Sequence, residues 1–83
     1  MSAIILFRSL THAQRGTRVL SAGGVPAKII KAPAGLSDKG CVYAAGVTEK
    51  RLRQALEVLD SRQISHGRVF VPDGSGGYRE VWA

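Results

Sequence analysis

The alternation of apolar and polar residues in the first third of the chain predicts a strand followed by a helix. Residues 3–7 (AIILF) form a continuous apolar run, which is typical of a central strand covered on at least one face. From Ser9 onward, three apolar residues and one threonine recur at spacings of three and four, which predicts a helix. They are Leu10, Ala13, Thr17 and Leu20. Ser9 is a favourable N-cap, and Gly23-Gly24 is the expected stop.

The remaining pattern predicts four more strands and a second helix. Strands are expected at residues 25–31, 41–47 and 68–71, and a short edge strand at 78–82 after a Pro, Asp and Gly turn. Residues 32–40 (APAGLSDKG) are expected to form a loop. Thr48 is expected to cap the second helix, whose apolar residues form one stripe. That stripe is Leu52, Ala55, Leu56 and Leu59.

The order βαββαβ with an added hairpin strand predicts a single α+β domain over residues 1–83, with the ferredoxin-like split βαβ arrangement. Two helices should cover one face of an antiparallel sheet. In this topology three landmarks share one end of the sheet. They are the start of the first helix with Arg8, Ser9 and His12, the loop that leads to Cys41, and the exit of the second helix over residues 62–66.

Cys41, the chain's only cysteine, is the candidate reactive residue. A helix N-terminus stabilises a nearby thiolate, and Arg8 and Lys39 would add positive charge. Gly40 would allow backbone amides to turn toward an anion. The alternative is that Cys41 begins a strand and is buried and inert, because free cysteine is among the most buried residue types.

The two histidines have no firm assignment. His12 and His66 could each support the thiol by ion pairing or proton transfer. A lone histidine near a helix start is more commonly a surface residue.

The net charge of +6 is uneven, with +5 in residues 1–41 and +1 in residues 42–83. A basic half suits an anionic partner, which could be nucleic acid, an acidic protein or a small anion. A single cysteine excludes an internal disulfide, and the five-residue apolar run is too short for a signal peptide or a membrane span. We therefore expect a cytoplasmic protein that does not bind a membrane or a metal and has no permanently bound cofactor. A homodimer would help so short a chain gain stability.

An RNA-recognition domain shares this strand and helix order, but its third strand carries aromatic residues on which bases stack. The corresponding stretch, KGCVYAAG, keeps the Lys-Gly start and only one aromatic, Tyr43. Two stacking positions are Cys41 and Gly46. The sequence therefore gives weak support to nucleic-acid binding, and it holds no close carboxylate pair for acid-base catalysis.

Three segments resemble the small bacterial selenium/sulfur carrier protein-like family. They are FRSLTHAQR (residues 7–15), GGVPAKIIKAP (residues 23–33) and GLSDKGC (residues 35–41). The resemblance implies that Cys41 carries sulfur or selenium as a transient persulfide or selenenylsulfide between a donor and an acceptor protein, without catalysing a reaction. One position departs from the family pattern, since the β-branched Val42 follows the cysteine where a small residue is usual.

Two further hypotheses come from other classes. The first is a basic module that binds nucleic acid or an acidic partner protein without thiol chemistry. The second is a ferredoxin-like regulatory domain that binds a small ligand at a dimer interface, for which the sequence offers no specific residues.

Overall fold

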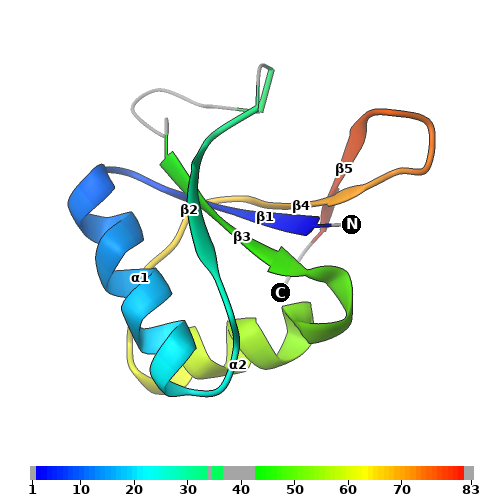
Figure 1. Ribbon diagram of the computed structural model, residues 1–83. Helices are drawn as coiled ribbons and strands as arrows, with labels where there is room; N and C mark the ends of the chain where they lie inside the picture. The colour runs from blue at the N-terminus through cyan, green and yellow to red at the C-terminus, as the bar shows by residue number, and fades with distance from the viewer. Residues whose placement is uncertain (1, 34, 37–42, 82–83) are drawn as a thin grey trace.

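The computed structural model describes residues 2–33, 35–36 and 43–81, and it has the expected α+β architecture. The elements are β1 (Ser2–Phe7), α1 (Leu10–Ala22), β2 (Lys28–Lys31), β3 (Tyr43–Thr48), a 3₁₀ turn η1 (Glu49–Arg51), α2 (Leu52–Ser61), β4 (Val69–Pro72) and β5 (Tyr78–Val81). The strands form one antiparallel sheet in the order β2-β3-β1-β4-β5. This is the ferredoxin-like order extended by one hairpin strand, with both helices packed on the same side of the sheet (Figure 1).

Both faces of β1 are buried, and alternate residues serve two different apolar clusters. Ala3, Ile5 and Phe7 face the helices, where they join Ala13 and Leu20 of α1 and Ala55 and Leu59 of α2. This division explains why the run AIILF has no polar position, since a strand buried on both faces needs apolar side chains throughout.

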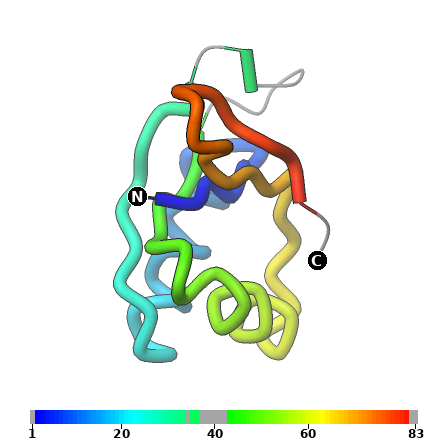
Figure 2. Tube along the Cα trace, turned by 90° about the vertical axis from the view of Figure 1, so that its right-hand side faces the viewer, coloured from blue at the N-terminus to red at the C-terminus, as the bar shows by residue number. Residues whose placement is uncertain are grey.

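The second cluster lies on the face without helices. It comprises Ile4, Leu6, Ala44 and Phe70, and Ile30, Ala32 and Leu36 pack against it. Figure 2 places the turn at residues 35–36 and α2 on opposite sides of the molecule. The chain after β2 therefore contributes cover to the face that a four-stranded sheet with two helices would leave open.

The first helix begins as expected, but its contacts differ from the expected stripe. Ser9 accepts a hydrogen bond from the His12 backbone N–H (3.2 Å) and so caps the helix. Leu10, expected in the core, is 41% exposed. Gly16 is buried instead, directly beneath the ring of Phe7, because only a residue without a side chain fits there.

The expectation of a second strand from Val25 is wrong, because β2 begins at Lys28. Val25 completes the end of α1: its N–H donates to the Leu20 carbonyl (2.8 Å), and the N–H of Gly24 donates to Ser21 (3.1 Å). With Gly24 in the left-handed region (φ +86°), these bonds form a Schellman motif. Val25 is buried as the apolar residue that closes this motif.

The entry to α2 also differs from the expectation. Thr48 is the last residue of β3, and its side chain makes no capping hydrogen bond. The chain passes through η1 before the α-helix begins at Leu52. The stripe is as expected, with Ala55 and Leu59 buried and Leu52 and Leu56 packed against the same core.

The strand expected at residues 68–71 is shifted by one residue, since β4 runs over Val69–Pro72. β5 runs over Tyr78–Val81, as expected for the described part of 78–82, and residue 82 lies outside the described residues. Arg68 bonds Glu80 across this hairpin (2.7 Å) and lies 5.2 Å from the centre of the Phe70 ring. A cation directly before β4 and a carboxylate of β5 thereby lie close together.

Candidate functional site

The end of the sheet where β1 finishes holds most of the predicted landmarks that the structure describes. Phe7, the last residue of β1, pairs with Tyr43, the first residue of β3, and Tyr43 pairs with Lys31, the last of β2. Ser9 follows Phe7 by two residues and starts α1. The chain therefore leaves β2 and enters β3 at the end where Arg8 and Ser9 lie.

Arg8, Ser9 and His12 are brought together by the first turn of α1. The Ser9 hydroxyl and the His12 Nδ1 are 2.7 Å apart, and the same hydroxyl caps the helix. This bond engages Nδ1 and leaves Nε2 as the imidazole nitrogen that could meet another group. Arg8 is exposed and forms no ion pair within the described ranges.

The first turn of α1 carries no acidic residue. A helix N-terminus has a partial positive charge and N–H groups without intrahelical partners. Since Arg8 adds a full positive charge and no carboxylate of that turn offsets it, this end of α1 is suited to an anion.

Lys39, Gly40 and Cys41, the remaining predicted site residues, lie outside the residues that the structure describes. The same is true of Val42 and Trp82. Their predicted roles stay predictions.

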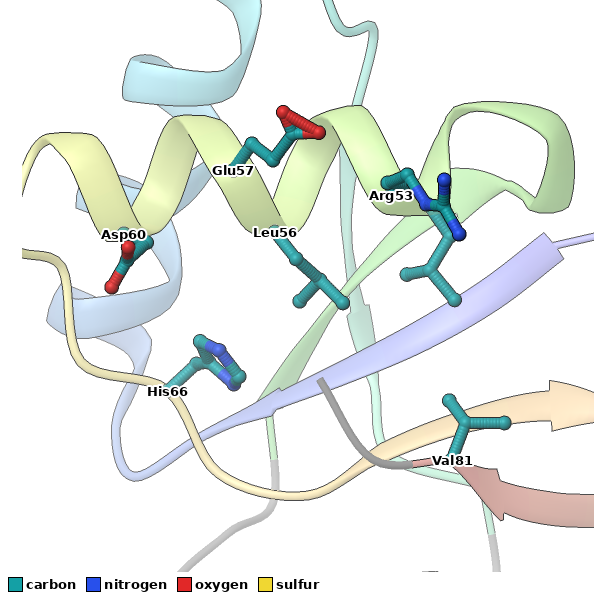
Figure 3. A pocket seen from close by; sticks show the side chains of 7 residues that line it. Arg53, Leu56, Glu57, Asp60, His66 and Val81 are labelled. Carbon is teal, nitrogen blue, oxygen red and sulfur yellow. The ribbon is translucent and has the colours of Figure 1, made fainter.

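His66 belongs to a different environment from His12. The segment before β4 does reach the end of β1, since the Gly67 N–H donates to the Leu6 carbonyl (2.7 Å). The His66 Nδ1, however, lies 2.7 Å from the Gly67 carbonyl, which can only accept, so the Nδ1–H donates a hydrogen bond to it. Its ring points toward α2 (Figure 3), and the structure gives it no hydrogen bond with Ser9 or His12.

A groove of about 600 Å³ lies between α2 and β5 (Figure 3). Leu52, Leu56 and Val81 supply its apolar lining, and charged or polar side chains stand around them. The latter are Arg53, Glu57, Asp60 and His66. Sequence reasoning missed this groove, because it exists only where β5 extends the sheet beyond the area that the two helices cover.

The structure also bears on the RNA-binding alternative. Tyr43 pairs with Phe7 and packs against the cluster on the helix side, so it does not face the open side of the sheet. On that open side Ile4, Leu6 and Ala44 are buried. The described part of the sheet therefore lacks the row of exposed rings on which bases would stack.

Two further properties concern the described residues only. They contain no group of three or more His, Cys, Asp or Glu side chains able to hold a metal ion. Neither α1 nor α2 is long and apolar enough to cross a membrane.

The fold and the first turn of α1 define a class, namely small ferredoxin-like α+β proteins with a basic sheet end. Comparison with protein families is more specific. The chain belongs to the family described as "Putative Se/S carrier protein-like", whose model matches residues 2–70. Comparisons with curated proteins and with solved structures found no match. The family expected from the three sequence segments is thus confirmed.

Proposed function

We propose that this protein is a non-enzymatic carrier of sulfur or selenium and that Cys41 holds the cargo. The observation that supports this most is family membership over residues 2–70, a range that includes the chain's only cysteine. One cysteine suits a carrier, because a second nearby thiol would attack the persulfide and close an internal disulfide.

The first turn of α1 supports the proposal through its charge. A persulfide or a thiolate is an anion, and the exposed Arg8, the start of α1 and, by sequence, Lys39 would each favour it. The His12 Nε2 is available as a second helper, since Nδ1 is bonded to Ser9.

The proposed transfer conserves atoms and electrons. The Cys41 thiolate attacks the terminal sulfur of a persulfide on a donor protein. A new S–S bond forms at Cys41 as the donor's S–S bond breaks, and the donor sulfur leaves with the electron pair as a thiolate. The persulfide proton stays with the transferred sulfur. Selenium would move in the same way from a donor selenenylsulfide.

The proposal is tested by the pH dependence of Cys41 alkylation in the native protein, followed by the intact mass after exposure to a persulfide donor. We expect an apparent pKa below the ordinary thiol value of about 8.5 and the stable gain of one sulfur atom. Arg8→Gln should raise that pKa, whereas Arg53→Gln, which changes a cation on the groove beside α2, should leave it unchanged. Cys41→Ser controls for the site of modification.

A thiol that reacts only after the protein is unfolded would contradict the proposal. Cys41 would then be a core residue, and the function would have to be sought on the basic surface.

A further inference from the structure

β2 is the outermost strand on its side of the sheet. It pairs with β3 through Lys28–Gly46, Ile29–Ala45, Ile30–Ala44 and Lys31–Tyr43, and the strand order ends with it. Alternate N–H and C=O groups of such a strand point away from the sheet, where a further strand can bond them.

The charges beside this edge have one sign. Residues 1–37 contain no aspartate or glutamate. The exposed charged side chains of α1 and β2 are therefore all cations, namely Arg15, Arg18, Lys28 and Lys31. Glu49, which follows β3, forms no ion pair with Lys28 in the described part of the chain.

An apolar opening adjoins the same edge. Ile29 is 39% exposed and, with Ala27, lines a groove of about 340 Å³ against α1. Gln14, Thr17, Arg18 and Ser21 form the helix side of this groove. In Figure 1, β2 and α1 run next to each other along this side of the molecule. Ile29 faces the helix layer, because it pairs with Ala45 of the helix-side cluster.

We infer that the edge of β2 is a docking site for an extended acidic segment of a partner protein, which adds to the sheet as a sixth strand. Backbone bonds to β2 would supply the pairing, Arg18, Lys28 and Lys31 would attract the carboxylates, and an apolar side chain would cover Ile29. The inference concerns binding alone and does not depend on the proposed chemistry of Cys41.

The same features argue against two other occupants. A second copy of the chain would bring its own Lys28 and Lys31 to the shared edge, and like charges at a strand edge oppose pairing. A single-stranded nucleic acid would need exposed rings on which to stack its bases. Neither α1 nor β2 contains a phenylalanine, tyrosine or tryptophan, and their one imidazole, that of His12, is bonded to Ser9.

The test uses the full chain and a labelled octapeptide of the pattern EEVEEVEE, which places glutamates on both faces of an added strand, with binding followed by fluorescence anisotropy over a salt series. Three competitors are compared: the same peptide N-methylated at its central residues, a lysine-valine peptide and an oligouridylate of equal charge. Lys28→Glu/Lys31→Glu is compared with Arg53→Glu/Arg79→Glu, which alters net charge equally on α2 and β5. Amide spectra confirm that each variant is folded.

We expect weak, salt-sensitive binding that shifts the amide signals of Lys28–Lys31. The β2 variant should weaken it by about tenfold or more, because two attractions become repulsions, and the control variant should weaken it far less. Equal binding of the N-methylated peptide would overturn strand addition. Tighter binding of the oligouridylate at the same amides, equal effects of the two variants, or self-association through β2 would each overturn the assignment of the occupant.

Discussion

Replacing Gly16 with alanine tests how tightly α1 is held against β1. Alanine is the better helix former by about 1 kcal/mol, so propensity alone predicts a more stable protein. A Cβ at this position, however, would lie 2.5 Å from Cζ and 2.8 Å from Cε1 of Phe7. Carbon atoms pack best at about 3.5–4.0 Å, so the ring or the helix would have to move by roughly 1 Å.

Phe7 has little room to move, since it is 1% exposed and lies within the helix-side cluster. Overpacking of a core typically costs about 1–3 kcal/mol, and two contacts below 3.0 Å place Gly16→Ala at the upper end. After subtraction of the propensity gain, we expect the free energy of unfolding to fall by about 2 kcal/mol. For a domain of this size, Tm would fall by roughly 10 °C.

Urea unfolding followed by circular dichroism measures this change. Gln14→Ala, an exposed substitution on the same helix, should stay within about 0.5 kcal/mol of the parent. Phe7→Leu should remove the clash, so that adding Gly16→Ala to it costs much less than in the parent protein. A Gly16→Ala variant as stable as the parent, or more stable, would refute the packing argument.

Two smaller predictions concern local hydrogen bonds. Ser9→Ala removes the cap of α1 and the partner of the His12 ring, and it should lower the free energy of unfolding by about 1 kcal/mol in the same urea assay, with Ser9→Thr largely retaining it. The pKa of Asp73 lies below its ordinary value of 3.8, chiefly because the Ser75 backbone N–H bonds the carboxylate, with the Ser75 hydroxyl and the Gly77 N–H adding to this. The stability that these hydrogen bonds give to the folded protein is complete above pH 3.8 and is lost as the pH falls through the lowered pKa. The Tm difference between the parent and Asp73→Asn should therefore be largest near neutral pH and shrink on acidification. A difference that grows in acid would contradict this prediction.

The apolar pattern was enough to predict the order of elements, because strands and helices differ in period. It predicted β1 and the stripe of α2 well. The pattern gave wrong predictions for Val25 and Leu10. The burial of each residue depends on how α1 ends at Val25 and starts at Leu10, and periodicity does not report on helix ends. Val25 is apolar because it closes a Schellman motif, and a local pattern cannot distinguish that from the start of a strand.

Helix α2 ends in the same motif without a glycine, which no sequence rule could indicate. Gln63 adopts the left-handed conformation (φ 58°), and the Ile64 N–H donates to the Leu59 carbonyl (2.8 Å). Residues other than glycine are unfavourable in that region, so a glutamine at position 63 does not indicate the end of a helix in the sequence.

The candidate site was predictable where it follows from topology. Arg8, Ser9 and His12 share one turn at the end of β1, as expected. The separate place of His66 was not predictable, because it depends on how the segment after α2 packs against α2 and β5.

The strand order has a consequence for how the chain folds. β1 is the most apolar strand, yet its neighbours in the sheet are β3 and β4, and residues at 43–48 and 69–70 must arrive before its pairing is complete. Such non-local pairing slows folding and prolongs the exposure of aggregation-prone apolar surface during synthesis. Only α1 is adjacent to β1 in the sequence, so the contact of Phe7 with Gly16 can cover the helix-side face of β1 early. Ile4 and Leu6, on the other face, are covered only after β3 and β4 have been synthesised.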